Sequence, residues 1–329
     1  MDAYKDQDTP AGVGGEPASS LLEALGEERL RAMVVTALEE DLGPRDLTTS
    51  SAVPAGRTVE ARLVAKAGGV LAGLELFGEA FRVCDAEAVV ELAFSDGERV
   101  AAGDEVARVR GDARAVLVAE RTALNFLQQL SGVATLTARY VERAAGRVRI
   151  LDTRKTVPLL RHLQKYAVAM GGGENHRFGL FDEAMIKDNH LDLAGLDLEA
   201  LTAQVRSELG ADIRITSEAR DAAEAEGAVR GGANVVLLDN MTPETLKALV
   251  PDLRSLANEL GRTVELEASG GVSLDAVDAL AETGVDRISV GALTHSAPVL
   301  DLSLLIDTRG ASSKPDGAQA SGAQGAGRG

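Results

Sequence analysis

The fold is decided by residues 197–217, "DLEALTAQVRSELGADIRITS", where a helical run leads into a short apolar run. The same alternation continues through the second half of the chain, in which the strand-like runs are "RVRILD", "EAMIKD", "DIRITS", "NVVLLD", "VELEAS" and "DRISVG". Repeated βα units of this kind produce a parallel sheet with helices outside it. Six strands predict an open, incomplete relative of the eight-stranded α/β barrel, with an open doubly wound sheet as the alternative fold.

The first half of the chain has a different pattern. Apolar residues recur at helical spacing from Arg29 to Gly43, which predicts one amphipathic helix. Short strand-like runs broken by Asp-Gly and Gly-Asp turns follow, and these predict an antiparallel sheet. A further helical run begins near Ala115 and stops before Ser131. We therefore expect an α/β domain over residues 21–130, a barrel over residues 131–308 whose last residues return to the first domain, and disordered tails at 1–20 and 309–329.

The composition narrows the classes of partner. The chain has 329 residues and a formal net charge of -17, so a nucleic acid or an anionic membrane would be repelled as the main partner. A single cysteine, Cys84, excludes an intramolecular disulfide and a cysteine-cluster metal site. The N-terminus lacks the pattern of a signal peptide, and no run of about 18 apolar residues could span a bilayer. The sequence therefore predicts a cytoplasmic protein.

Polar residues stand at the carboxyl end of each predicted barrel strand, in "ILDTRK", "MIKDNH", "ITSE", "LLDN", "EASGG" and "SVGALTH". In a barrel these ends converge on one face, where the active site lies. The candidate cations are Arg154, Lys155, His176, Arg177 and Lys187, and the candidate carboxylates are Glu218 and Asp239. A pocket with both signs of charge suggests an anionic ligand together with a divalent cation or sugar hydroxyls.

Two glycine-containing segments follow the last two strands, "SGG" at residues 269–271 and "VGALTH" at residues 290–295. Barrels often bind phosphate at this place through backbone N–H groups. The residues therefore predict a phosphorylated sugar and a carboxylate-bearing partner as ligands.

Each signal also has a structural explanation when it is taken alone. An Arg-Lys pair such as Arg154-Lys155 is more often a solvated surface than a ligand site. "GGG" at 171–173 is typical of a helix end, and His162 lies within a helical run, where a structural role is expected. His190 and His295 fit helix capping or a satisfied core position.

Several motifs together resemble a known family. In order and spacing, "EEDLGPRDLTT", "ERTALNFLQQLSGVAT", "LDTRKTVP", "KYAVAMGGGENHR", "MIKDNH", "LLDNM" and "EASGG" resemble quinolinate phosphoribosyltransferases, the carboxylating nicotinate-nucleotide pyrophosphorylases of NAD biosynthesis. The similarity runs from about Glu39 to about Ile306. It implies an N-terminal α/β sandwich joined to an incomplete α/β barrel, in homodimers or assemblies of dimers. In these dimers, the sandwich of one subunit covers the barrel mouth of the other.

The resemblance also implies a reaction and its residues. The family transfers a phosphoribosyl group from 5-phosphoribosyl 1-pyrophosphate to quinolinate and releases pyrophosphate and CO2, with Mg²⁺ bound to the pyrophosphate substrate and no organic cofactor. The implied catalytic residues are Lys155, Glu218 and Asp239, the last two also holding the metal indirectly. The implied substrate-binding residues are Arg121, which reaches across the dimer, and Thr153, Arg154, His176, Arg177, Lys187, Ser269, Gly270, Gly271 and Gly291.

Some positions depart from the family pattern. Val157 and Leu159 replace a usual threonine and glycine, and the strand before Glu218 lacks the usual alternating glutamates. Leu159 bears on the start of the following helix and on the fit around a 5'-phosphate.

Two other functions compete with this interpretation. A related phosphoribosyltransferase could act on a different pyridine acid, such as nicotinate, although it would need fewer cations. A biotinyl or lipoyl carrier is suggested by "FSDGERVAAGDEVARV", but such a carrier needs a lysine at its turn, and no lysine occurs between Asp85 and Gly111.

Overall fold

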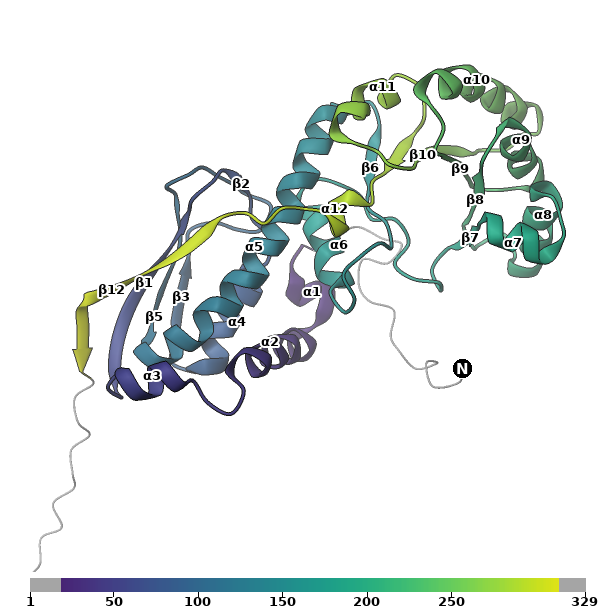
Figure 1. The fold of residues 1–329 in the computed structure, drawn as a ribbon. Coiled ribbons are helices and arrows are strands. Elements are labelled where there is room, and N and C mark those ends of the chain that lie inside the picture. The colour runs from purple at the N-terminus through teal and green to yellow at the C-terminus, as the bar shows by residue number, and fades with distance from the viewer. Residues whose placement is uncertain (1–18, 314–329) are drawn as a thin grey trace, which may run out of the picture.

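The computed structural model describes residues 19–313, which form two lobes joined by one long helix (Figure 1). Most of the two predicted tails lies outside the described residues. Within the described part, Ser20 is the N-cap of the first helix, and residues 309–313 continue the last strand.

The N-terminal lobe is a four-stranded antiparallel sheet covered by helices. Its sheet has the order β12-β1-β5-β3, in which β12 is Leu302–Ser313, and α2 and α4 pack with α5 (Ala113–Ala144) over one face (Figure 1). The elements are α1 (Leu21–Leu25), α2 (Glu27–Leu42), α3 (Leu47–Ala52), β1 (Arg57–Ala65), β2 (Gly69–Val70), α4 (Leu74–Cys84), β3 (Val89–Leu92), β4 (Arg99–Val100) and β5 (Glu105–Asp112). The predicted helix and antiparallel sheet are confirmed. α2 ends at Leu42 and is capped by Gly43, whose φ of 53° lies in the left-handed region that favours glycine.

The C-terminal lobe is a six-stranded parallel sheet in the order β6-β11-β10-β9-β8-β7. Its strands are β6 (Arg149–Leu151), β7 (Ala184–Ile186), β8 (Ile215–Ala219), β9 (Val235–Asp239), β10 (Glu265–Ser269) and β11 (Arg287–Ser289). The helices of this lobe are α6 (Arg161–Met170), α7 (Asp188–Ala194), α8 (Leu198–Leu209), α9 (Ala222–Gly231), α10 (Pro243–Glu259), the 3-10 helix η2 (Leu274–Ala276), α11 (Val277–Ala281) and α12 (Ala292–His295).

The order of the strands decides between the two predicted folds. From β7 to β11 each new strand is added on the same side of the previous one, as in a barrel. A doubly wound sheet would reverse direction, so that alternative is wrong. Within residues 19–313, the edge strands β6 and β7 do not pair, so the barrel is open. The predicted incomplete barrel is confirmed.

The helix that joins the lobes is longer than the sequence suggested. α5 (Ala113–Ala144) runs through Ser131 and Gly132, where we expected a helix end. The small residues serve packing instead, because a Cβ on Gly132 would lie 2.1 Å from the carbonyl oxygen of Pro298. The chain crosses α5 there before β12 (Leu302–Ser313) returns to pair with β1. The expected division at residues 130/131 therefore falls inside one continuous helix.

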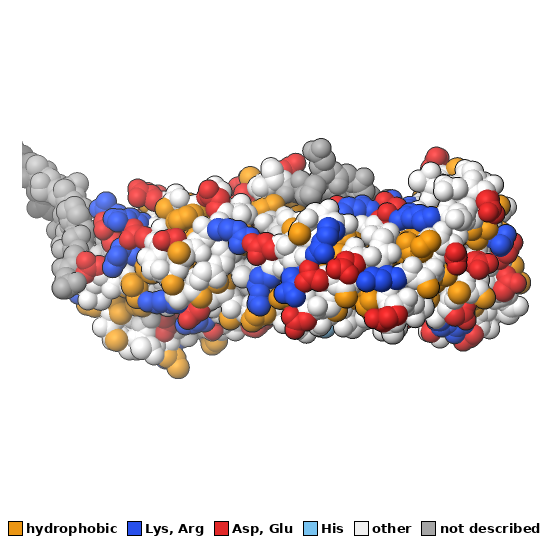
Figure 2. Space-filling model, turned by 90° about the horizontal axis from the view of Figure 1, so that it is seen from above, with side chains coloured by type: hydrophobic (Ala, Val, Ile, Leu, Met, Phe, Trp, Pro, Cys, Tyr) orange, Lys and Arg blue, Asp and Glu red, His pale blue; other side chains and the backbone are white. Residues whose placement is uncertain are grey.

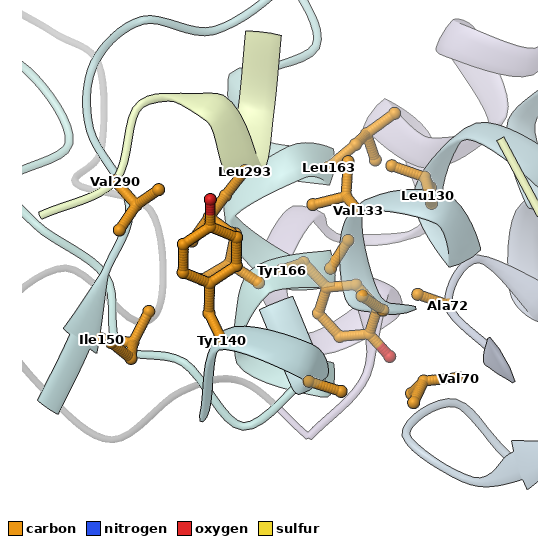
Figure 3. Packing of buried hydrophobic residues seen from close by; sticks show 14 of the residues in the cluster. Val70, Ala72, Leu130, Val133, Tyr140, Ile150, Leu163, Tyr166, Val290 and Leu293 are labelled. Carbon is orange, nitrogen blue, oxygen red and sulfur yellow. The ribbon is translucent and has the colours of Figure 1, made fainter. Parts of the chain in front are cut away.

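α5 carries a hydrophobic core that is shared by both lobes. Leu130, Val133 and Tyr140 on α5 lie among residues of the N-terminal lobe, of α6 and of the barrel, with Val70, Ala72, Ile150, Leu163, Tyr166, Val290 and Leu293 in the same view (Figure 3). Close packing of side chains allows the elements that share a core little movement relative to one another. The orientation of the barrel relative to the sandwich is therefore fixed by packing rather than by a linker.

The segment between β6 and α6 contains the unusual Leu159. Its φ is 68° and its side chain is 91% exposed, so a leucine occupies a backbone conformation that favours glycine. The helix after it still forms, because α6 begins at Arg161 and the N–H of Leu160 bonds back to the carbonyl of Val157 at 3.1 Å. The departure at Leu159 is accommodated without loss of the helix.

The outer surface carries charges of both signs. In the view of Figure 2, lysine and arginine side chains alternate with aspartate and glutamate side chains, without a continuous basic patch on that face. None of the helices within residues 19–313 has the length and apolar character required to cross a membrane.

Candidate active site

A cavity of about 550 Å³ opens at the carboxyl ends of the barrel strands. Its lining contains the cations Arg154, Lys155, His176, Arg177 and Lys187, the carboxylates Glu218, Asp239 and Glu267, and also Thr153, Met185, Leu237, Asn240, Ser269, Gly270, Gly271 and Ser289. A volume of this size suits a small-molecule ligand. The structure thus brings together every predicted site residue except Arg121 and Gly291.

The period of the strands explains which side chains face the cavity. Alternate residues of a strand point to the same side. Leu237 and Asp239 on β9 form one such pair, and Glu267 and Ser269 on β10 form another. The sequence analysis missed Glu267, Asn240 and Ser289. All three lie in the strand-end segments "EASGG", "LLDN" and "SVGALTH", and counting back two residues from Ser269 would have identified Glu267.

The segment after β6 is held to α12, the short helix that follows β11. The N–H of Lys155 donates to Thr153 Oγ1 at 3.0 Å, and the hydroxyl of Thr294 donates to the carbonyl of Lys155 at 2.8 Å. Gly291 stands behind Lys155, since a Cβ on Gly291 would lie 3.1 Å from Lys155 Cδ. Gly291 therefore makes room for the lysine rather than lining the cavity itself.

Two carboxylates stand on neighbouring strands. Glu218 on β8 forms an ion pair with Lys187, and Asp239 on β9 accepts a hydrogen bond from Asn240 Nδ2 at 2.7 Å. In the part of the chain that the structure describes, no group of three histidine, cysteine, aspartate or glutamate side chains could hold a metal ion. Two carboxylates suit Mg²⁺ that arrives with a phosphorylated substrate, because such an ion keeps most of its ligands from water and phosphate.

The loop after β10 exposes its backbone to the cavity. Gly270 has a φ of 99°, and a Cβ there would lie 2.2 Å from Asn240 Oδ1. Only glycine fits this position, because any side chain would collide with the neighbouring loop. The wall of the cavity is therefore main chain at this point.

A buried ion pair lies beneath the cavity. Lys165 Nζ is 2.5 Å from Asp152 Oδ1, and both side chains are fully buried. Lys165 also donates to the carbonyl of His176 at 2.7 Å, and the N–H of His176 donates to Asp152 at 2.9 Å. Burial raises the pKa of Asp152, to about 6, and lowers the pKa of Lys165. The sequence did not reveal this pair, which fixes the backbone at His176.

The side chain of His176 faces a second buried pair. Its Nε2 lies 3.4 Å from Glu267 Oε2, and Arg287 Nε lies 2.7 Å from the same oxygen. Burial alone would raise the pKa of Glu267, but the interactions with His176, Arg287 and Ser289 outweigh it and hold the pKa at about 2. Glu267 is therefore ionised in the interior of the barrel.

Arg121 and three histidines lie outside this cavity. Arg121 is exposed on the N-terminal half of α5. His190 caps α7, where its Nδ1 accepts from the N–H of Lys187 at 2.9 Å, and His295 Nδ1 lies 2.6 Å from Ser296 Oγ. The ring of His162 packs against Phe178, with centroids 5.4 Å apart.

His162 should make stability depend on pH. Burial, with the nearby charges of Arg29, Arg161 and Lys165, lowers its pKa from 6.5 to about 4. Between these values the unfolded chain binds a proton that the folded chain does not, so the free energy of unfolding should fall as the pH drops from 6.5 to 4. Replacing His162 with glutamine should flatten this slope in urea titrations at several pH values. An equal slope in both proteins would contradict the assignment.

Two family models match the chain. The model described as quinolinate phosphoribosyl transferase, N-terminal domain, matches residues 46–131, and the model described as quinolinate phosphoribosyl transferase, C-terminal domain, matches residues 133–305.

Curated relatives and solved structures are similar over most of their length. The chain is 40% identical over 266 residues to a probable nicotinate-nucleotide pyrophosphorylase (carboxylating) of Bacillus subtilis strain 168. The matched residues cover 80% of this chain and 89% of the relative. The chain is 41% identical over 293 residues to the chloroplastic nicotinate-nucleotide pyrophosphorylase (carboxylating) of Oryza sativa subsp. japonica, covering 85% and 78%. The structure of the nicotinate-nucleotide pyrophosphorylase from Francisella tularensis has a TM-score of 0.78 and 34% identity, covering 84% of this chain and 96% of that one. The crystal structure of NadC from Streptococcus pyogenes has a TM-score of 0.79 and 36% identity, covering 87% and 98%.

Proposed function

Because this chain belongs to the quinolinate phosphoribosyltransferase family, we infer that it is a pentosyltransferase that makes nicotinate mononucleotide for NAD biosynthesis. It transfers the phosphoribosyl group of 5-phosphoribosyl 1-pyrophosphate to quinolinate and releases pyrophosphate and CO2. One observation carries this conclusion beyond the family match. A chain with a net charge of -17 gathers five basic side chains in one cavity, and both substrates are anions.

The dicarboxylate would bind at the cations after β6 and β7. Arg154 and Arg177 line the cavity with guanidinium groups, whose planar fork fits a carboxylate, and Lys187 adds a third positive charge. Lys187 is held by Glu218, so a substrate carboxylate would share or displace that contact. His176 borders the same side of the cavity.

The phosphoribosyl group would lie toward β8 to β11. Glu218 and Asp239 would hold ribose hydroxyls, and the backbone at Ser269, Gly270 and Gly271 would receive phosphate. Lys155, with Thr153 beside it and Gly291 behind it, would contact the pyrophosphate. Mg²⁺, bound with the pyrophosphate and reached indirectly by Glu218 and Asp239, would neutralise charge on that leaving group.

The residues suit a reaction without a protein nucleophile. When the bond between ribose C1 and pyrophosphate breaks, its electron pair leaves with pyrophosphate, and Lys155 would stabilise that charge. The pyridine nitrogen then donates its lone pair to C1. The resulting pyridinium ring accepts the electrons of the bond to the adjacent carboxylate, CO2 departs, and a proton takes its place on the ring carbon. Catalysis would come from positioning and electrostatics.

A second subunit would complete the site. Arg121 is exposed and does not line the cavity of its own chain, yet its motif matches a substrate-binding arginine of the family. We propose a homodimer in which Arg121 of one subunit reaches the quinolinate bound by the other, within a dimer or a larger assembly of dimers. We also propose a cytoplasmic location and no organic cofactor.

The test is a direct comparison of substrates. Purified protein with phosphoribosyl pyrophosphate and Mg²⁺ should form nicotinate mononucleotide and CO2 in equal amounts from quinolinate. Nicotinate should give a kcat/KM at least about 100-fold lower, because the site would leave partly buried cations without the second carboxylate. EDTA should stop turnover. Comparable kcat/KM for nicotinate would favour the alternative function, a phosphoribosyltransferase for another pyridine acid.

A further inference from the structure

Glu267 is a buried charge that the proposed reaction does not use. It lies on β10, inside the barrel, with its side chain fully buried at the floor of the cavity. Within residues 19–313, neither of its carboxylate oxygens has a hydrogen-bond donor in good geometry. Buried carboxylates are costly unless a partner compensates them. The groups beside the carboxylate of Glu267 are His176 and Arg287.

Three of the four polar groups of His176 are hydrogen-bonded within the protein, and Nε2 is the exception. Its backbone N–H and carbonyl are held by the buried pair Asp152 and Lys165. Its Nδ1 accepts the backbone N–H of Arg177 at 2.7 Å. A backbone N–H can only donate, so Nδ1 must carry the lone pair and the ring proton must sit on Nε2.

The Nε2–H group then faces Glu267. Nε2 is buried and lies 3.4 Å from Glu267 Oε2. This distance is longer than that of a good hydrogen bond, but the partial positive charge of the N–H group faces the negative carboxylate. Arg287 stands 2.7 Å from the same oxygen and balances the negative charge. Nδ1 of His176 is therefore engaged within the protein, whereas Nε2 faces Glu267 without a hydrogen bond of good geometry.

We propose that Glu267 is a positioning residue, which holds the His176 ring in one orientation and one tautomer so that the carboxylate-binding side of the cavity keeps its shape. This role rests on the proposed function, because the shape matters only if quinolinate binds there. The arginines and Lys187 would then bind the dicarboxylate, with His176 held in one orientation beside them.

Glu267→Gln tests the tautomer directly. The variant keeps the size of the side chain, but its amide oxygen is drawn to Arg287 and its NH2 group then faces His176. Two donors would meet at Nε2, so the ring must rotate or move its proton to Nδ1, where it meets the N–H of Arg177. With four histidines in the chain, long-range ¹H–¹⁵N spectra can resolve His176, assigned by its loss in His176→Ala. We expect Nε2–H in the wild type and a changed pattern in Glu267→Gln.

Kinetics test whether Glu267 acts through His176. Glu267→Gln should lower kcat/KM for quinolinate by roughly 10-fold or more, as for other residues that orient a histidine. In a His176→Ala background the same change should cost less than about twofold, because additivity fails for residues that act as one unit. Losses that multiply would overturn the proposal, as would a Glu267→Gln protein with an unchanged spectrum and unchanged kinetics.

Glu265→Gln is the matched control. Glu265 lies two residues earlier on β10, 3.3 Å from Arg287 Nη1 and 2.8 Å from Arg149 Nη2, and it forms no contact with His176. The Glu265→Gln variant should leave the His176 spectrum unchanged and kcat/KM within about twofold of the wild type. If Glu267→Gln does not fold, Glu267→Asp keeps the charge and should keep the Nε2–H tautomer. The spectra are recorded without substrate, so they test the role of Glu267 even if the protein does not turn over quinolinate. A lack of turnover would refute only the proposed function.

Discussion

Replacing Arg121 with alanine should lower kcat/KM for quinolinate by about 100- to 1000-fold, because a substrate carboxylate in the proposed shared site would lose a charged partner. This expectation is specific to a shared site. Arg121 is exposed on α5 and does not line the cavity of its own chain, so a large loss requires that the side chain act in another subunit. Steady-state kinetics with quinolinate as the varied substrate measure the effect. Arg62→Ala, in an exposed arginine paired with Glu105, is the control and should stay within about twofold.

Mixing experiments show where Arg121 acts. A hybrid dimer of Arg121→Ala and Lys155→Ala subunits has one site with both defects and one site with neither. After subunit exchange, random pairing should restore about a quarter of the wild-type activity. Native mass spectrometry can verify that hybrids have formed. If verified hybrids recover nothing, Arg121 acts within its own chain or not at all, and the shared site is refuted.

The second large effect concerns the stability of the barrel. Lys165→Met should lower the free energy of unfolding by about 3–5 kcal/mol, since it leaves Asp152 as a buried carboxylate without its cation. Urea denaturation followed by circular dichroism measures the change. Lys247→Met removes a cation from an exposed pair with Glu282 and should change stability by less than about 0.5 kcal/mol.

The loss in Lys165→Met should depend on pH. Burial already raises the pKa of Asp152, and without Lys165 the folded protein would keep that carboxyl protonated at still higher pH. The unfolded chain releases the proton near its ordinary pKa, so stability is retained at low pH and lost as the pH rises. The variant should therefore be closer to the wild type at pH 5 than at pH 8. The double variant Asp152→Asn/Lys165→Met should recover part of the loss, and failure to recover would mean that the cost is not electrostatic.

Local patterns predicted the barrel well for a physical reason. Each of the six strand-like runs became one strand of the parallel sheet, because each run supplies apolar residues, such as Ile150, Leu238 and Ile288, that are buried in the core. Polar residues at the ends of these runs then had to meet at one edge, which is why Arg154, Lys187 and Asp239 could be assigned to one cavity.

The helix boundary was predicted less well. "SGVATL" at residues 131–136 has the small residues of a helix end, yet α5 continues to Ala144. The reason is a contact distant in sequence, the approach of Pro298 to Gly132. A local pattern cannot distinguish a glycine that ends a helix from one that admits a neighbouring chain.

The sequence by itself determined the class of fold, the family and most of the residues around the cavity. These depend on local periodicity and on short motifs, both of which can be identified in the sequence alone. Only the tertiary structure decided which charges are paired beneath the cavity, namely Asp152 with Lys165 and Glu267 with Arg287, and how they direct His176. Glu267 and Arg287 stand on two different strands, 20 residues apart, where the parallel pairing of β10 with β11 places them side by side. Burial and long-range pairing set the energies of these charges, and neither is a property of a residue and its neighbours in sequence.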